Sequence, residues 1–468
     1  MFPAMRRAAL ALGSCTLLAG AVFACESDPD GVGGPSFELD GSVPSFDGGQ
    51  QPFDGGTPDS SPDAPPGPPS VTVTVTDRSG AKAGTRVVFH DASGAVIEEK
   101  VTDASGKAKS TTAALPAMAT ALLTSDRGRQ LVTWTAIEAG DDLAVRAQDM
   151  EDGELGRFDV SVPALPDGTQ YWYGYASGCS GEGGGGTSGS IQLYPFCARQ
   201  STTSMLAYAY DTENQLLGHS FKKGIAVPAS GVATPVTTGA WASPSAVTLT
   251  ATNTPNRVAQ VELLEIADGH GYEIGFRRPL ENGSATFQAA TGFADALQAS
   301  LRLTTPAGGE QVIAKRVAPT TTIEFDAADV LPAIANADIA DGTNGKRPVI
   351  SWESSASTAS ADGGLVRLQF WGRNEEQYVW TIVVPPGSTT VSAPALPADA
   401  NEFLPDADAG QGWYPPEVGF IEADVIPTYK AFRTQQGTLA PAGTSLTFGF
   451  PALAVNGTYR ATGWVFAF

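Results

Sequence analysis

The sequence is poor in cysteine, histidine and basic residues. Among 468 residues there are four cysteines and three histidines, and 28 Lys and Arg stand against 50 Asp and Glu, giving a formal net charge of −22 at pH 7. An acidic surface repels phosphate backbones, so nucleic acid is excluded as an expected partner. After the N-terminal segment, no run approaches the roughly 20 apolar residues that a membrane-spanning helix needs.

Catalytic and metal-binding signatures are lacking as well. His90, His219 and His270 fall in separate predicted domains, and no metalloprotease, P-loop or nucleophile-elbow motif occurs. Asp141 and Asp142 are adjacent acids of the kind a glycosidase uses, but adjacent residues on a strand point to opposite faces. The sequence therefore predicts no enzyme activity, no cofactor and no metal site.

What the chain has in quantity is glycine and proline, 53 and 34 residues, beside many Thr, Val and Ser. This composition favours strands and turns over helices. Val71 to Thr76 alternates with period two, and the turns Asp91–Gly94 and Asp103–Gly106 follow at a spacing typical of β-sandwiches. We expect an all-β fold of tandem Ig-like sandwich domains.

A similar Val- and Thr-rich opening recurs at Val71, Val160 and Val247, at intervals of 89 and 87 residues. That interval is the length of an Ig-like domain and predicts domains at 70–148, 149–240, 241–330 and 331–468. The alternative is coincidence among strands of similar composition.

The first of these domains carries a motif of moderate specificity. Its parts are Val73-x-Val75-x-Asp77-x-x-Gly80 and Thr102-Asp103-Ala104-x-Gly106-Lys107-Ala108. Over residues 70–148 the chain resembles the carboxypeptidase regulatory-like, or bacterial Ig-like, β-sandwich domain. The resemblance implies a sandwich module and no catalysis.

The last domain opens with a proline followed by a strand that contains Trp352. A later strand, Tyr378 to Val384, ends at Pro385 and Pro386. This arrangement is loosely similar to a fibronectin type III module, in which Trp352 is expected to be the core tryptophan.

The N-terminus has the features of an export signal. Arg6 and Arg7 precede an apolar stretch from Ala8 to Ala24. Val22-Phe23-Ala24-Cys25 resembles the lipobox of bacterial lipoproteins, which implies a diacylated Cys25 that holds the chain on a membrane. The alternatives are ordinary cleavage after Ala24 and a second lipobox-like stretch ending at Cys15.

Residues 1–24 are thus expected to be a lipoprotein signal peptide. Residues 25–69 are acidic and rich in Pro, Gly and Ser, so they cannot bury enough apolar area to order themselves. We expect a disordered tether there. The expected location is the bacterial cell envelope, at the outer membrane or the cell surface, with the membrane as a partner through the N-terminal lipid.

The two remaining cysteines, Cys179 and Cys197, flank a glycine-rich segment. A disulfide between them is the default in an oxidising exported compartment. A metal site is the alternative, but it needs more ligands than two cysteines.

The best candidate for ligand binding is the segment from Tyr171 to Tyr175. On a strand, Tyr171, Tyr173 and Tyr175 share one face, with Trp172 on the other. Three tyrosines in a row suit sugar rings, and the alternative is that this face is core. We expect a non-catalytic, lipid-anchored protein that displays Ig-like modules for adhesion or for binding a glycan or protein ligand.

Overall fold

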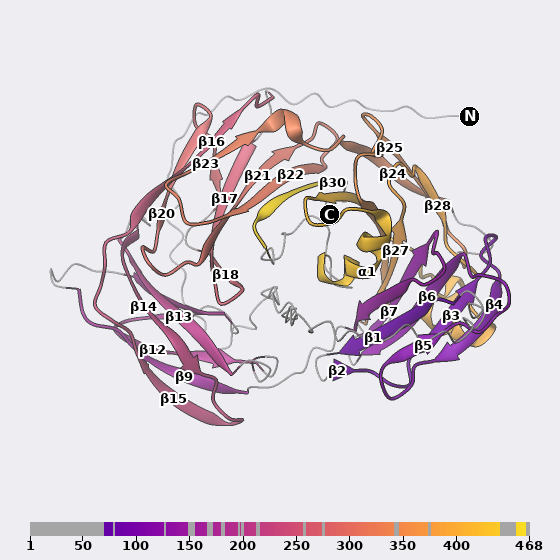
Figure 1. Ribbon diagram of the computed structural model, residues 1–468, viewed down its shortest axis with the longest axis horizontal. Helices are drawn as coiled ribbons and strands as arrows, with labels where there is room; N and C mark the ends of the chain where they lie inside the picture. Colours follow the sequence, from indigo (N-terminus) through magenta and orange to yellow (C-terminus); the bar gives the residue numbers. More distant parts are fainter. Residues whose placement is uncertain are drawn as a thin grey trace, which may run out of the picture. The chain divides into compact units, whose positions relative to one another are not determined.

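The structure is a computed structural model, and it describes only part of the chain. The described ranges are 70–77, 80–125, 128–147, 155–165, 172–178, 183–194, 197, 201–211, 216–255, 259–273, 277–340, 346–372, 376–439 and 455–464. Strands predominate in these ranges, beside the α-helix α1 (Tyr429–Leu439), which confirms the all-β fold class (Figure 1). The predicted signal peptide and tether lie outside the described residues.

The first sandwich, sandwich 1, consists of two facing layers of four strands each. One sheet contains β1 (Thr72–Asp77), β2 (Gly80–Ala81), β5 (Lys107–Lys109) and β8 (Asp142–Arg146). The facing strands are β3 (Arg86–His90), β4 (Val96–Val101), β6 (Met118–Ser125) and β7 (Gly128–Thr135). The alternation predicted from Val71 to Thr76 is confirmed, because Val73 and Val75 of β1 are fully buried between the sheets.

Sandwiches 2 and 3 repeat the same connectivity. In sandwich 2 the first sheet contains β9 (Gly156–Ser161), β12 (Ser188–Leu193) and β15 (Val232–Thr237), and it faces β10 (Trp172–Ser177), β11 (Gly183–Gly185), β13 (Thr202–Tyr210) and β14 (Leu216–Ala226). In sandwich 3 it contains β16 (Ser245–Thr252), β20 (Ser284–Ala289) and β23 (Thr322–Asp326), and it faces β17 (Ala259–Ala267), β18 (His270–Glu273), β19 (Arg278–Pro279), β21 (Ala296–Thr304) and β22 (Glu310–Val317).

The shared feature of these three sandwiches is a parallel pair between the first and the last strand. β1 pairs in parallel with β8, β9 with β15, and β16 with β23. Each first strand also pairs antiparallel with a strand that lies between the first and the last in the sequence, which is β5, β12 or β20. The three Val- and Thr-rich stretches of the sequence thus fall in β1, β9 and β16, which occupy equivalent positions in the three sandwiches.

Sandwich 4 is connected differently. Its smaller sheet contains β24 (Ile334–Ala340), β25 (Val349–Ser354) and β28 (Thr390–Ser392). The facing strands are β26 (Gly363–Trp371), β27 (Gln377–Val384), β29 (Glu417–Ala423) and β30 (Gly457–Trp464). Trp352 of β25 is buried between the two layers and packs near Phe420 with ring centroids 6.0 Å apart, as expected of a core tryptophan.

Sandwiches 1, 3 and 4 share one sheet, which we call the continuous sheet. Among the described residues it comprises thirteen strands in the order β18-β17-β21-β22-β30-β29-β26-β27-β7-β6-β3-β4, with β19 paired to β17. The part of this order from β27 to β4 can be followed in Figure 1. Backbone hydrogen bonds therefore cross the boundaries of these three domains.

Two junctions create the continuous sheet. At the first, β27 of sandwich 4 pairs in parallel with β7 of sandwich 1, from Gln377 opposite Gly128 to Val383 opposite Trp134. A Cβ on Gly128 would lie 1.9 Å from the Gln377 carbonyl oxygen, so this approach requires glycine. The Trp380 indole N–H also donates to the Thr133 hydroxyl across the junction, at 2.8 Å.

At the second junction, β30 lies between two sandwiches. It pairs antiparallel with β22 of sandwich 3 over seven residues, and with β29 of sandwich 4 over six. Both edges of β30 are therefore occupied, and its backbone joins strands that lie about a hundred residues apart in the sequence.

Helix α1 fastens sandwich 4 to sandwich 1. Arg433 of α1 and Asp141, just before β8, form an ion pair at 2.8 Å in which each side chain is only 1% exposed. The Tyr429 hydroxyl donates to the carbonyl oxygen of Thr135 at 3.0 Å, and the Phe432 ring lies against Gly363. Because a buried charge without its partner is costly, this ion pair constrains where α1 lies.

Candidate functional site

The tyrosines predicted to form a ligand-binding face are core residues where the structure describes them. Tyr173 and Tyr175 are 8% and 0% exposed, and they pack between the two sheets of sandwich 2. The Tyr175 hydroxyl donates to the Gly186 carbonyl oxygen. Tyr171 lies outside the described residues. The prediction of an open tyrosine platform is therefore corrected for Tyr173 and Tyr175, whose rings cannot reach a ligand.

The physical reason lies in the packing of both sheet faces. The inner face of β10 packs on the sheet of β9, and Gly189 of β12 leaves the space that the Tyr175 ring occupies. On the outer face, the Tyr208 ring of β13 lies directly over Gly174, where a Cβ would come within 1.9 Å of a ring carbon. Alternation predicted which residues share a face, but it did not show which of the two faces is core.

The opposite face of β10 carries an exposed aromatic ring. Trp172 is 52% exposed, and its ring centroid lies 5.9 Å from that of Tyr208 and 5.6 Å from that of Tyr210. The two tyrosines are themselves buried and meet edge to face at 5.2 Å. We call these three residues the Trp172 cluster. Its two tyrosines hold the exposed indole in place, which suits flat or ring-shaped ligands.

Part of this cluster is visible as a pattern in the sequence. Leu206, Tyr208 and Tyr210 alternate with alanine along β13, which places the two tyrosines on one face beside Trp172. Alternation also places Trp172 on the face of its strand away from Tyr173 and Tyr175. Only the sheet shows that the strand of Trp172 pairs with that of Tyr208 and Tyr210.

The sheet face of sandwich 2 that carries the Trp172 cluster also packs against sandwich 3. The contact buries an apolar group that contains Leu206, Tyr208, Tyr272 and Phe293. Around it, the Tyr272 hydroxyl donates to the Ser204 carbonyl oxygen at 2.9 Å, and Lys223 pairs with Asp295 at 2.9 Å.

Two titratable groups are buried at this contact. His219 of β14 is fully buried, with Nε2 3.2 Å from the Thr291 carbonyl oxygen, and burial lowers the pKa of its imidazole. Glu265 of β17 is 1% exposed and accepts a hydrogen bond from the Ala290 N–H. Burial raises the pKa of the Glu265 carboxyl to about 8.

The other two histidines are buried, and the adjacent acids Asp141 and Asp142 differ in exposure. His90 is fully buried beside the Thr120 hydroxyl, and burial lowers its pKa to about 4, while His270 is 4% exposed. Asp141 is held in its ion pair with Arg433, whereas the neighbouring Asp142 is exposed and accepts from the Thr74 hydroxyl at 3.0 Å. Within the described ranges, no three His, Cys, Asp or Glu side chains gather closely enough to hold a metal ion.

The cysteine predictions fall partly outside the described residues. Cys197 is buried in the core of sandwich 2, whereas Cys179 and Cys25 are not described. The disulfide and the lipidation of Cys25 stay predictions. In the part of the chain that the structure describes, no helix is both long enough and apolar enough to cross a membrane.

A second aromatic group surrounds the loop that precedes β29. Trp413 is half-buried, with its ring centroid 5.1 Å from that of Phe370 and 6.2 Å from that of Trp380. Nearby, Arg129 donates to the Tyr378 hydroxyl at 2.7 Å and pairs with Glu402 at 3.0 Å. These contacts link β7 to sandwich 4, so this group lies at the first junction.

Comparisons with known proteins leave the family open. No family model matches the chain, and no curated protein matches it. The resemblances of residues 70–148 and 331–468 to named modules therefore stay predictions.

Solved structures give weak similarities. The Bacillus anthracis TIE protein aligns at 11% identity and a TM-score of 0.13, over 55% of this chain and 49% of that one. The alpha-2-macroglobulin of E. coli aligns at 12% identity and a TM-score of 0.12, over 73% and 26%. A Salmonella alpha-2-macroglobulin mutant aligns at 13% identity and a TM-score of 0.10, over 73% and 27%. The chain thus spans half or less of these proteins, and the alignments carry no argument about function.

Glu265 generates a testable pH dependence. Its folded-state pKa of about 8 lies above the usual 4.5, so the stability it contributes is present below pH 4.5 and is lost as pH rises toward 8. Glu265→Gln keeps an acceptor for the Ala290 N–H but cannot ionise. Between pH 5 and 8.5 the free energy of unfolding of the unmodified chain should fall by roughly 4 kcal/mol relative to that of Glu265→Gln.

Urea denaturation across this pH range measures the difference. Glu281→Gln, which changes an exposed glutamate of the same sandwich, is the matched control and should follow the unmodified chain. Parallel pH profiles for the unmodified chain and Glu265→Gln would contradict a buried, neutral Glu265.

Proposed function

We propose that this chain is a non-catalytic, lipid-anchored protein of a bacterial cell envelope, which displays joined β-sandwiches for adhesion or ligand binding. The observation that carries the proposal is the continuous sheet. Repeated sandwiches are bonded edge to edge through β7–β27 and β22–β30. A scaffold of this kind presents surface groups at fixed positions, which is what recognition by loops and strand faces requires.

The state of the polar groups supports a binding role rather than acid–base chemistry. All three histidines are buried, and Asp141, one of the acids considered for a glycosidase pair, is neutralised by Arg433. Charged side chains near the sandwich junctions form ion pairs, such as Arg129 with Glu402 and Arg86 with Asp399. These groups are therefore partnered within the chain.

The proposed anchor is tested at Cys25. If Cys25 is acylated, Cys25→Ser should shift the protein from the membrane to the soluble fraction, because the lipid is the proposed attachment. Cys15→Ser is the matched control and should leave partitioning unchanged, since that residue would be removed with the signal peptide. Membrane partitioning that is the same for all three chains would contradict the anchor.

Carbohydrate binding is the second candidate function. The specific observation in its favour is the Trp172 cluster, in which a half-exposed indole is supported by two buried tyrosines. Stacking on an aromatic face is a common way to hold a sugar ring. The earlier candidate face of Tyr173 and Tyr175 is core, so the proposed surface is the opposite face of the same strand.

A glycan array with the purified chain tests this function. Trp172→Ala should weaken any glycan binding at least about tenfold, the equivalent of about 1.4 kcal/mol. Trp371→Ala is the matched control, because Trp371 is 50% exposed but belongs to β26 of sandwich 4. Glycan binding that both variants reduce equally, or that neither reduces, would place the ligand elsewhere.

A further inference from the structure

We infer that β4 is a pairing edge at which a second copy of this chain adds its own β4 in antiparallel orientation. The inference is independent of the proposed anchor and ligand. It rests on the free edge of the strand, on its exposed side chains, and on a register in which the strand is complementary to itself.

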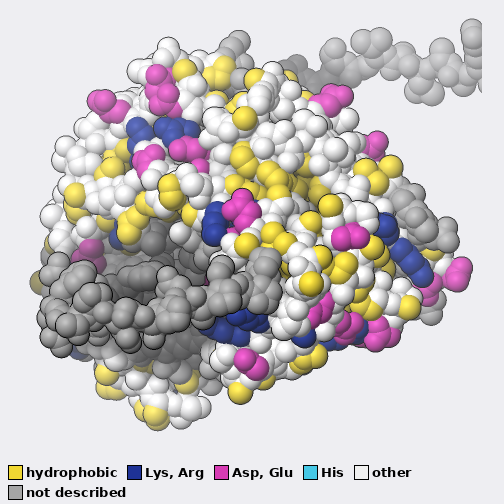
Figure 2. All heavy atoms as spheres, turned by 45° about the vertical axis from the view of Figure 1, so that its right-hand side comes forward, with side chains coloured by type: hydrophobic (Ala, Val, Ile, Leu, Met, Phe, Trp, Pro, Cys, Tyr) yellow, Lys and Arg dark blue, Asp and Glu magenta, His cyan; other side chains and the backbone are white. Residues whose placement is uncertain are grey.

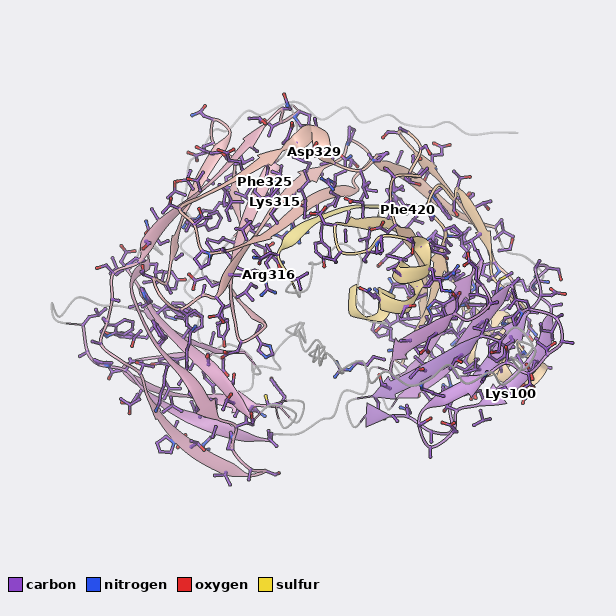
Figure 3. All side chains as sticks on the ribbon, in the orientation of Figure 1. Lys100, Lys315, Arg316, Phe325, Asp329 and Phe420 are labelled. Atoms are coloured by element: carbon purple, nitrogen blue, oxygen red, sulfur yellow. The ribbon has the colours of Figure 1, made fainter. Side chains whose placement is uncertain are left out.

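β4 is the terminal strand of the continuous sheet. It pairs with β3 on one side, and no described residue forms a backbone hydrogen bond with the other edge of residues 96–101. Figure 3 labels Lys100 on this outermost strand. Unpaired N–H and C=O groups along a strand are a template for another strand.

Several other strand edges in the described part of the chain are covered or protected, although strands such as β12, β20 and β23 also end sheets. In sandwiches 1 and 3 the edges of β7 and β22, which lie at the opposite end of their sheets from β4 and β18, are closed by β27 and β30. In sandwich 2 the edge of β14 is bridged at His219 by Ala242. β15 also ends a sheet, but Pro235 interrupts it, and proline is a usual protection against edge pairing.

β4 differs from these edges in its side chains. Val96, Ile97 and Val101 are 41%, 36% and 56% exposed, and they are three of the ten large hydrophobic side chains exposed among the described residues. Hydrophobic side chains interspersed with charged ones are visible on the side of the molecule that Figure 2 brings forward. Exposed aliphatic side chains on a free edge favour strand addition.

The occupant follows from the register of charges. If two copies pair antiparallel about Glu99, Glu98 lies opposite Lys100 of the second copy, in place of the pair that these residues form within one chain. Ile97, the extra residue of a bulge against β3, lies across from Val101. Apolar and oppositely charged pairs at directly opposed positions both stabilise a sheet. A register shifted by one residue would instead oppose Glu98 to Glu99 and Ile97 to Lys100, which is unfavourable.

Glu99 itself would face Glu99 of the second copy. Each Glu99 already pairs with Arg86 at 2.8 Å, and Arg86 also pairs with Asp399 at 3.0 Å. The centre of the pair thus brings two guanidinium groups together with its acids, so the like charges are compensated. β4 therefore selects another β4 in preference to a strand of unrelated sequence.

Cysteine cross-linking tests the register directly. In the full chain carrying Cys25→Ser, neither a shared lipid surface nor Cys25 can link two copies. Directly opposed Cβ atoms lie about 4.5–5.5 Å apart and diagonal ones about 7–8 Å, so Glu99→Cys should form a disulfide-linked dimer and Lys100→Cys should not. Each substitution removes one partner of an ion pair, which makes the two variants matched.

Sedimentation equilibrium tests the surface. The double variant Ile97→Lys, Val101→Lys should weaken self-association at least about tenfold, while Val232→Lys, an equally exposed valine on β15, should leave it unchanged. A chain that stays monomeric up to about 100 µM, a concentration that would reveal micromolar affinity, would overturn the inference. Equal cross-linking by Glu99→Cys and Lys100→Cys would overturn it as well.

Discussion

Edge-to-edge hydrogen bonding between sandwiches is the constraint on which the rest of this structure depends. Each sheet of a β-sandwich ends in edge strands. An unpaired edge leaves a row of backbone donors and acceptors exposed. In this chain sandwich 4 supplies β27 and β30, which close the edges of β7 and β22. The consequence is that three sandwiches fold around one sheet, with α1 and the Arg433–Asp141 pair fixing the same arrangement from the side.

This constraint explains the burial pattern of the strands. β3 would be half-buried in an isolated sandwich, but Val87 and Phe89 pack into one core while Val88 packs into another that it shares with Trp352 and Trp380. Sandwich 2 stands apart, because it joins sandwich 3 through side chains such as Tyr272 and Phe293 rather than through a shared strand. Its outer sheet face therefore remains partly open, and there Trp172 is exposed.

The sequence predicted local structure well, because period-two alternation reflects which side of a strand is buried. It located the strand at Val71 to Thr76, the inward Val87 and Phe89, and the core position of Trp352. It did not predict that strands such as β7 and β27, about 250 residues apart, share a sheet, because backbone hydrogen bonding between edges leaves no pattern in side chains. The sequence also indicated the correct strand for an aromatic surface but the wrong face. Tyr173 and Tyr175 can be assigned to the core only once the facing sheet is known.

The central claim is that β30 makes sandwiches 3 and 4 one hydrogen-bonded unit, and amide hydrogen exchange tests it most directly. Ala461→Pro removes a backbone N–H from the middle of β30, whereas Val455→Pro places proline at an exposed position just before the strand. The account predicts that Ala461→Pro lowers protection in both β22 and β29, strands of different sandwiches, and that Val455→Pro lowers it in neither. Loss of protection confined to β30 itself would contradict the account.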